Sequence, residues 1–442
     1  MAARGSSTSP PLAVVSSDSH VGPLPGQLRE YCPAGLLDAF DAEVEKNSRR
    51  ATISRAKIEL AELGVSRRSG GAIETRDPFR NRRTAGHHDS AARLADMDRD
   101  GVAASVIFHG SQNGHVIPFV DFVSSFYGAI PSADRQDREL EGRRIYNRWL
   151  ADFCAEAPNR HIGLCQIPVW DLDASIGEVR WASDHGLRGV HFPANTVGVP
   201  SFEDPVWDPF FAECAERGMT LSTHISGAEQ IDPGYKGPGV WGIRALEGPL
   251  LGRRTIWLLI FAGVFDRHPD LRFVVTEVPG AWWGELVREM DAAYFSWHGR
   301  RSLQSFLAMK PSEYAHRNVW VGASFASRAE AAEAVGNSAE GRLMWGSDYP
   351  HTEGTWTFSE DRSEPSVTRL SLANTFHDLG EEAIRRMVGG NAVDCYSLDR
   401  SAVDEIARRV GPSLEEVSTP PDLSAVPDHY QGYGFRTRGA WS

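Results

Sequence analysis

Residues 162–193 read IGLCQIPVWDLDASIGEVRWASDHGLRGVHFP, and this stretch indicates the fold. Apolar and β-branched residues in IGLCQIPV (162–169) and GVHFP (189–193) predict two short strands. The residues between them, 173–185, predict a helix. Two strands joined through a helix lie parallel, because the crossover carries the chain back to the starting edge of the sheet.

The same alternation continues in both directions along the chain. Further strands are predicted at 13–20, 104–110, 220–227, 272–278, 319–325 and 343–351, and further helices at 89–100 (with Asp89 as N-cap), 137–157, 204–218, 250–267, 282–296, 328–336 and 366–388. Eight strand–helix units predict an α/β protein with a distorted TIM (β/α)8 barrel, and an open doubly wound sheet is the alternative.

The rest of the chain falls outside this repeat. Residues 1–12 are small and polar and predict a disordered, cytoplasmic N-terminus without a secretory signal. The barrel takes 13–398, with a charged insertion at 38–88 after the first strand, expected at the barrel mouth. Residues 399–442 form a C-terminal extension rich in proline, serine and charge.

Composition excludes several classes of function. The 442 residues carry a formal net charge of −13, which gives no basic surface for nucleic acid or an anionic membrane. The longest nearly unbroken apolar run, Ile256 to Phe265, is much shorter than the ~20 residues of a membrane-spanning helix. Five dispersed cysteines argue against a disulfide framework and a cysteine zinc site.

Imidazoles and carboxylates stand at the ends of the predicted strands, where barrel enzymes place their catalytic groups. These side chains, which are also the ones that bind divalent metals, are Asp18, His20, His109, His191, His224, Glu277 and Asp348. Asp18 and His20 are two residues apart on a strand, so both face the same side and can share one ion.

Each residue taken alone has a simpler interpretation. A single strand-end histidine is more often a hydrogen-bonded packing residue, and Asp18 alone is more often a cap or turn residue. The joint pattern, from the first, fifth and eighth strands, favours a metal site over independent packing roles.

Four segments resemble the amidohydrolase superfamily in order and spacing: VVSSDSHVGP (14–23), LSTHISG (221–227), HPDLRFVVTEVPGAWW (268–283) and LMWGSDYPH (343–351). The most similar branch is the amidohydrolase-related group that includes aromatic-acid decarboxylases. The resemblance implies that Asp18, His20, His224 and Asp348 are metal ligands. The chain is also similar to peptide-tailoring amidohydrolases of bottromycin-type pathways.

The sequence departs from the family pattern in three places. The usual first-strand H-x-H reads D-x-H here, which admits metals other than zinc. No lysine lies near His191, where dinuclear relatives have a bridging lysine, and this favours one ion. Glu277 stands where many relatives have a histidine; it is a poorer proton donor at neutral pH unless burial raises its pKa. We therefore expect one divalent ion, zinc first, with manganese or another divalent ion as alternatives.

The resemblance and the strand-end residues together suggest roles. Asp348 would exchange a proton with a metal-activated water, and Glu277 and His191 would be further catalytic residues. The expected substrate-binding residues are His109, Trp241, Trp282 and His351.

The main prediction is a metal-dependent hydrolase of a carbon–nitrogen bond, acting on a small molecule or a modified peptide. One alternative is a non-oxidative decarboxylase of a small aromatic or enoic acid, which the missing sixth-strand histidine makes less favoured. Another is a barrel that binds a ligand without catalysis. The sequence leaves homo-oligomer formation open.

Overall fold

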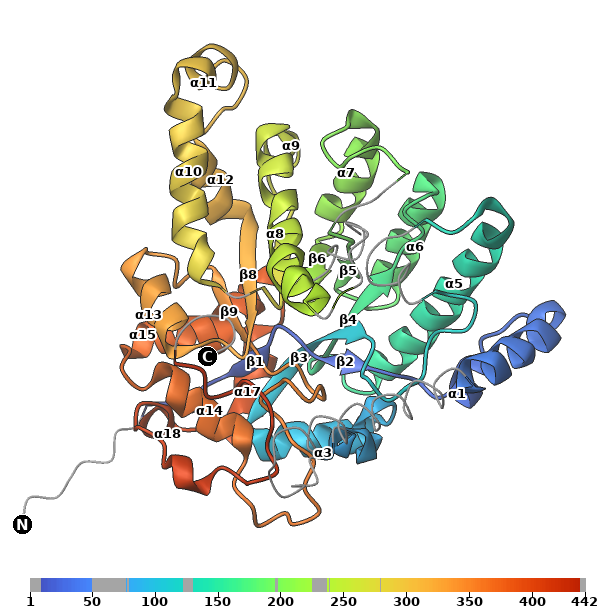
Figure 1. The fold of residues 1–442 in the computed structure, drawn as a ribbon, viewed down its shortest axis with the longest axis vertical. Helices are drawn as coiled ribbons and strands as arrows, with labels where there is room; N and C mark the ends of the chain where they lie inside the picture. The colour runs from blue at the N-terminus through green and yellow to red at the C-terminus, as the bar shows by residue number, and fades with distance from the viewer. Residues whose placement is uncertain are drawn as a thin grey trace, which may run out of the picture.

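The computed structural model describes residues 9–49, 77, 79–121, 130–194, 198–224, 237, 239–278 and 280–437. Its strands lie side by side at the centre of the molecule, and helices surround them (Figure 1). The strands are β1 (Val14–Ser16), β2 (His20–Val21), β3 (Val102–His109), β4 (His161–Gln166), β5 (Gly189–His191), β6 (Thr220–His224), β7 (Phe273–Thr276), β8 (Val319–Ser324) and β9 (Leu343–Gly346). All neighbouring strands are parallel, in the order β1-β3-β4-β5-β6-β7-β8-β9, with β2 also paired to β3.

Backbone hydrogen bonds between the first and last strands close the barrel. Ser17 donates to the carbonyl of Trp345 at 2.9 Å, and Asp348 donates to the carbonyl of Asp18 at 3.1 Å. The predicted first strand is split, because residues 17–19 bend between β1 and β2 to pair with the end of β9; Ser19 forms an isolated bridge with Tyr349. The predicted distorted TIM barrel is therefore confirmed.

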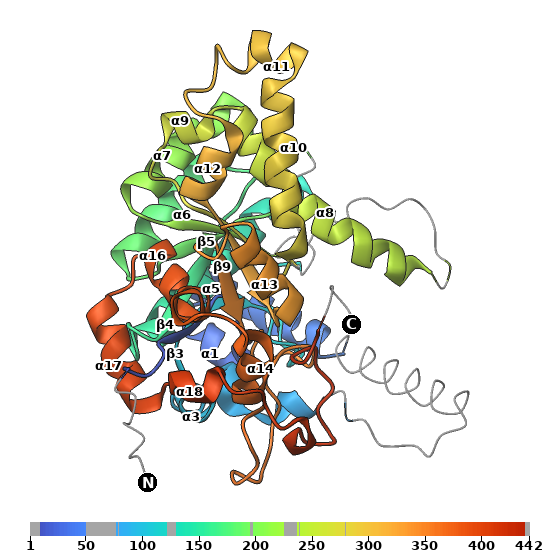
Figure 2. The same cartoon turned by 90° about the vertical axis from the view of Figure 1, so that its left-hand side faces the viewer.

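The described helices are α1 (Pro25–Arg29), α3 (Ser90–Asp100), α5 (Ala133–Ala155), α6 (Leu172–Asp184), α7 (Asp208–Glu216), α8 (Val240–Phe261), α9 (Val264–Arg267), α10 (Trp283–Phe295), α11 (Trp297–Ser302), α12 (Pro311–Asn318), α13 (Arg328–Gly336), α14 (Val367–Phe376), α15 (Glu381–Arg385), α16 (Asn391–Cys395), α17 (Arg400–Val410) and α18 (Leu414–Val417). Shorter turns are η1 (Ala34–Leu36), η2 (Arg80–Arg83), η3 (Ala85–His87), η4 (Pro205–Trp207), η5 (Gly280–Trp282), η6 (Arg386–Gly390) and η7 (Leu423–Ala425). The ends of α10 and α11 project beyond the barrel (Figure 2). No helix in the described part of the chain is both long and apolar enough to cross a bilayer.

Local sequence explains several of these boundaries. The side chain of Asp89 accepts a hydrogen bond from the amide of Ala92 at 2.7 Å, so its predicted N-cap role at α3 is confirmed. Gly101, in the left-handed conformation, ends the same helix. The predicted helix 366–388 is interrupted after α14 and continues as α15 and the π-helical turn η6, where Gly389 lies against the carbonyl of Ala13 with no room for a Cβ atom.

The inner faces of the strands pack into one core. Paired residues of parallel neighbours point to the same side, and a buried cluster accordingly contains Val15, Val106, Phe108, Ile162, Leu164, Val274, Trp320 and Met344. Tyr396 closes the N-terminal end of the barrel, where its hydroxyl lies 2.9 Å from that of Ser222. α17, from the C-terminal extension, adds Val403 and Ala407 to the same cluster. The C-terminal ends of the strands are left to carry polar groups.

Residues of the insertion meet this polar end where the structure describes them. Asn81, in η2, donates hydrogen bonds to the carbonyls of His351 and Trp356, both at 3.2 Å. Residues 37–49 are helical, and residues 50–76 lie outside the described part of the chain. The placement of the whole insertion over the barrel mouth stays a prediction.

Candidate metal centre

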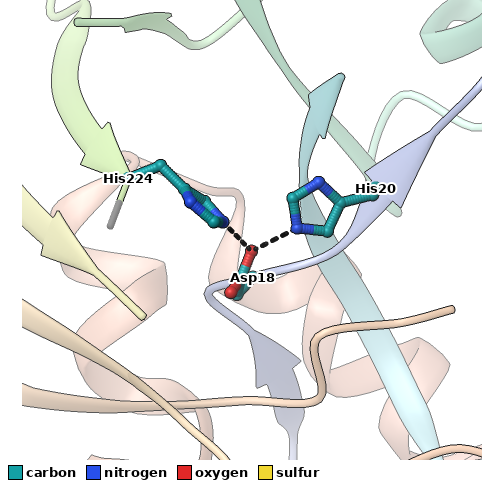
Figure 3. A group of neighbouring side chains, drawn as sticks. All are labelled: Asp18, His20 and His224. Atoms are coloured by element: carbon teal, nitrogen blue, oxygen red, sulfur yellow. Dashed lines mark ion pairs between the residues drawn. The ribbon is translucent and has the colours of Figure 1, made fainter. Parts of the chain in front are cut away.

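The bend between β1 and β2 carries the first two side chains of the site. Asp18 lies on the bend, and His20 is the first residue of β2. The amide of His20 donates a hydrogen bond to the carbonyl of Tyr349 at 2.6 Å. Nε2 of His20 is 3.3 Å from Oδ1 of Asp18, and both side chains are fully buried (Figure 3). The bend thus turns two metal-binding side chains toward the same point.

Two other strands bring their side chains to this point. His224 is the last residue of β6, and its Nε2 lies 3.7 Å from Oδ1 of Asp18 (Figure 3). Asp348 follows β9, and its Oδ1 lies 3.2 Å from Nε2 of His20. The structure therefore brings together the four residues that the family resemblance implies as ligands.

The donor set fits a divalent cation. Among the described residues, no amide, hydroxyl or guanidinium group donates to Oδ1 of Asp18 or to either carboxylate oxygen of Asp348, and imidazole nitrogens are their polar neighbours. Buried carboxylate oxygens without donors are costly, and imidazole nitrogens beside them complete a mixed nitrogen–oxygen set. A divalent ion held between them would offset the repulsion of the two carboxylates.

Neighbouring groups orient two of these side chains. Ser324, at the end of β8, donates its hydroxyl to Oδ2 of Asp18 at 2.5 Å. Nδ1 of His20 lies 3.0 Å from the carbonyl oxygen of His109, which can only accept, so Nδ1 carries the proton. In a neutral His20 the lone pair of Nε2 then faces the centre, as a metal ligand requires.

The pKa values of the two first-strand residues reflect their mutual attraction. Burial opposes ionisation of Asp18, but the positive charges of His224 and His20 outweigh it and lower its pKa well below the usual value. Burial alone would lower the pKa of His20, whereas its contacts with Asp18 and Asp348 raise it to about 10. A proton on His20 and a metal ion are therefore alternative ways to balance the same carboxylates.

Glu277 lies at the edge of the centre. Its Oε2 is 3.3 Å from Nε2 of His224, and its side chain is 12 % exposed. Its φ of 56° places it in the left-handed region, as does the φ of 55° at Asp348, a strained conformation for both residues. Burial, and then the charges of Asp348 and Asp18, raise the pKa of Glu277 well above its ordinary value.

His351 is the second group at the edge. Its Nε2 lies 2.7 Å from the carbonyl of Gly110, and its Nδ1 lies 2.9 Å from Oδ1 of Asp348. Since both ring nitrogens face acceptors, the doubly protonated form fits this geometry. Burial lowers the pKa of His351, but Asp348 outweighs this effect and the net shift is upward.

His191 lies on the inner face of the barrel, where its ring centre is 6.5 Å from that of His224. Arg143 donates to Oε1 of Gln166 at 3.2 Å, so the amide nitrogen of Gln166 faces Nδ1 of His191, 3.0 Å away. Nδ1 therefore accepts, and a neutral His191 carries its proton on Nε2. Burial lowers the pKa of His191 well below its ordinary value and keeps it neutral.

The other expected substrate-binding residues have surroundings of their own where the structure describes them. The ring of His109 packs against Tyr146 of α5 at 5.3 Å between ring centres, and burial lowers its pKa to about 3. Trp282, in the turn after β7, is 8 % exposed and lies under the guanidinium of Arg253 at 4.6 Å. The side chain of Trp241 lies outside the described part of the chain.

Sequence reasoning missed three residues around the centre. Ser324 orients Asp18, and Glu353 has a carboxylate oxygen within 4.8 Å of ligand atoms of Glu277 and Asp348. Arg93, on α3, is fully buried and donates to the carbonyl of His20 at 2.9 Å. A serine at a strand end and an arginine in an amphipathic helix carry no signal of such roles, whereas Glu353 lies two residues after the LMWGSDYPH segment and could be considered from the sequence.

Comparison with known proteins identifies the family. A family model described as Amidohydrolase matches residues 77–398. The chain belongs to the amidohydrolase family. The match spans most of this amidohydrolase, from the end of the insertion to the last residues before α17.

Named relatives of this amidohydrolase are decarboxylases. It is 26% identical over 319 residues to the 2-amino-3-carboxymuconate-6-semialdehyde decarboxylase of Dictyostelium discoideum, an alignment that covers 70% of this chain and 77% of that protein. It is 28% identical over 163 residues to the gamma-resorcylate decarboxylase of Rhodococcus jostii (strain RHA1), covering 33% and 48% of the two chains. The 5-carboxyvanillate decarboxylase of Novosphingobium aromaticivorans, solved with bound manganese, shares the fold with a TM-score of 0.56, 19% identity, and coverage of 87% of this chain and 97% of that chain.

These relatives correct the main functional prediction. The expected hydrolysis of a carbon–nitrogen bond is wrong, because the named relatives break a carbon–carbon bond to a carboxylate. The prediction against decarboxylation rests on Glu277, which stands in place of a histidine. Burial raises the pKa of this carboxyl group and makes it a usable acid, so the replacement does not disfavour decarboxylation.

Proposed function

We propose that this amidohydrolase is a metal-dependent decarboxylase of a small aromatic or enoic carboxylic acid. The observation that carries the proposal is that Asp18, His224 and Asp348 are gathered around His20: Asp18 and Asp348 contact Nε2 of His20, and His224 contacts Asp18, with all four side chains buried. The decarboxylase relatives supply the reaction class. A modified-peptide substrate, a homo-oligomer and a cytoplasmic location remain predictions.

We propose one divalent ion at this point, held by these four side chains. Two imidazoles and two carboxylates suit zinc and manganese, and a structural neighbour holds manganese. When bound, the ion supplies positive charge that holds an oxygen of the substrate and stabilises the electron pair left on carbon.

The residues of this chain account for the proton in the reaction. The bond between carbon and the carboxylate breaks, carbon dioxide leaves, and the electron pair stays on the carbon, which takes up one proton. Protonated Glu277, beside His224, is placed to give that proton from its carboxyl oxygen. Burial is the largest cause of the raised pKa of Glu277, ahead of the charges of Asp348 and Asp18.

His351 would act on the substrate through its positive charge, and His191 through its ring. The protonated form of His351 beside Asp348 favours an anionic group at the rim. Nε2 of His191 carries a proton, fixed by the contact of Nδ1 with Gln166. Groups that are set before the substrate arrives need no rearrangement during the reaction.

The test is release of carbon dioxide by metal-loaded protein. The purified protein, loaded with zinc or with manganese, would be incubated with 2,6-dihydroxybenzoate, 5-carboxyvanillate and related carboxylated phenols and muconates. We expect carbon dioxide and a decarboxylated product, which in heavy water carries one deuterium at the former carboxylate carbon. The Asp348→Asn variant is the matched inactive control.

Two results would overturn the proposal. If metal-loaded protein releases no carbon dioxide from any member of the panel, the decarboxylase assignment fails. If folded protein binds no divalent ion, the metal centre fails and the ligand-binding barrel becomes the better interpretation.

A further inference from the structure

The C-terminal extension returns to the mouth of the barrel. We call residues 430–437 the C-terminal strap; they follow the last short turn, η7, and lie beyond the residues that the family model matches. The strap contacts the loops that follow β8 and β9. The first loop begins directly after Ser324, and the second contains Asp348. It is therefore joined to two sides of the candidate metal centre.

The first set of contacts holds the loop after β9. The amide of Tyr433 donates to the carbonyl of Glu353 at 2.8 Å, and the hydroxyl of Tyr430 donates to the carbonyl of Gly354 at 2.8 Å. The same hydroxyl accepts from the amide of Gly434 at 2.7 Å. A Cβ atom on Gly432 would lie 2.1 Å from the carbonyl oxygen of Gly354, so only glycine allows this approach.

The second set of contacts holds the loop after β8. Arg436, which is 3 % exposed, donates from Nε and Nη2 to the carbonyl of Phe325 at 3.1 and 2.8 Å. Its Nη2 also lies 2.9 Å from Oε2 of Glu330, which pairs the buried charge. The rings of Tyr433 and Phe325 are 5.7 Å apart.

Both loops contain a residue with a strained backbone conformation. Phe325 has a φ of 44° and Asp348 a φ of 55°, left-handed conformations that cost non-glycine residues about 1–3 kcal/mol each. Strained residues persist only where surrounding contacts fix them. Phe325 directly follows Ser324, the hydrogen-bond donor to Asp18, so a shift at Phe325 would reach the centre through that bond.

We propose that the C-terminal strap is a positioning element of the metal centre, with Tyr430 and Arg436 as its positioning residues. By fixing the carbonyls of Glu353, Gly354 and Phe325, the strap sets where Asp348 and Ser324 stand relative to the other ligand atoms. It also holds the backbone of Glu353, whose carboxylate has an oxygen within 4.8 Å of ligand atoms of Glu277 and Asp348. The inference rests on the proposed metal centre and adds a segment that the family model does not include.

The test compares variants of the full-length chain. Tyr430→Phe removes one hydroxyl and two hydrogen bonds but keeps the ring; Arg436→Met removes the guanidinium. Tyr31→Phe, which loses a hydroxyl contact to Asp152 between α1 and α5, and Arg408→Met, at an exposed position, are matched controls. Zinc affinity would be measured without substrate by competition with a chromogenic chelator, alongside the thermal midpoint and turnover.

We expect Tyr430→Phe to weaken zinc affinity about threefold to tenfold, at most the effect of one lost neutral hydrogen bond, because affinity changes only through the shifted positions of Asp348 and Ser324; the loss should be larger for Arg436→Met. Turnover should fall with it, and both controls should stay at the wild-type values. If Arg436→Met does not fold, Tyr430→Phe decides alone. Zinc affinity within twofold of wild type in Tyr430→Phe, even with a lowered thermal midpoint, would overturn the positioning role. A wild-type protein that binds zinc but releases no carbon dioxide would count against the proposed function, not against the strap.

Discussion

The hydrogen bond from Ser324 to Asp18 gives a prediction whose size can be worked out. The Ser324→Ala variant removes one oxygen from a side chain that is 3 % exposed and leaves Oδ2 of Asp18 without its 2.5 Å donor. The carboxylate is then free to rotate, and Oδ1 no longer faces the centre before a metal arrives. Because the same bond exists in the metal-free and metal-bound protein, the effect on affinity comes from this lost orientation.

The expected magnitude is a 10–100-fold weaker metal affinity, the usual effect of removing a group that orients a ligand. This corresponds to about 1.4–2.7 kcal/mol, within the ~1.5–3 kcal/mol that a hydrogen bond to a charged group contributes. The dissociation constant of zinc would be measured at neutral pH by chelator competition on protein first stripped of metal.

The matched control is Ser175→Ala, another fully buried serine, whose hydroxyl donates to the carbonyl of Pro168 at 2.8 Å at the start of α6. This variant should lose about 1 kcal/mol of unfolding free energy and keep its zinc affinity. A dissociation constant for Ser324→Ala within twofold of wild type would refute the role of Asp18 as an oriented ligand.

Three further predictions concern single residues. Because Asp18 and Asp348 raise the pKa of His20 to about 10, metal uptake at neutral pH should release about one proton and affinity should rise with pH, as calorimetry in buffers of different ionisation enthalpy would measure; no proton release would contradict this. Glu277→Gln should lower kcat by about 100-fold to 10,000-fold with metal retained, and unchanged turnover would exclude Glu277 as the proton donor. Burial raises the pKa of Asp100 from 3.8 to about 6, so the folded state favours the protonated form; this contribution to stability is fully present below the unfolded pKa of 3.8 and is lost as the pH rises through about 6. At about 1.4 kcal/mol per pKa unit, Asp100→Asn should add up to about 3 kcal/mol to the unfolding free energy at pH 7 and little at pH 4, and an equal gain at both pH values in denaturant titrations would show that burial of the charge is not the cause.

The fold could be predicted because it repeats. Buried parallel strands are short apolar runs, and a helix follows each one to carry the chain back. Every strand–helix unit in the sequence therefore supports the prediction of a parallel barrel. The predicted ends of individual helices are less accurate. Helix α8 begins at Val240 rather than near residue 250, although it contains Pro249, because packing of its later turns outweighs the hydrogen bond that proline cannot make.

The convergence of the four site residues could also be predicted, since each stands at the C-terminal end of a strand. Their supporting groups could not. Ser324 and Arg93 act through single hydrogen bonds to Asp18 and to the carbonyl of His20, and such contacts depend on which strands become neighbours when the barrel closes. The type of reaction could not be predicted from the residue types either, because Glu277 can donate a proton only if burial raises its pKa.

The sequence by itself determined the alternation of strands and helices and the identity of the side chains at the strand ends, because both follow from local pattern. The tertiary structure alone decided that residues 17–19 bend to close the barrel, that Glu277 lies partly buried beside the carboxylates of the centre, and that residues 430–437 return to the loops after β8 and β9. These features depend on contacts between segments up to several hundred residues apart, and no local pattern of hydrophobicity or charge specifies them.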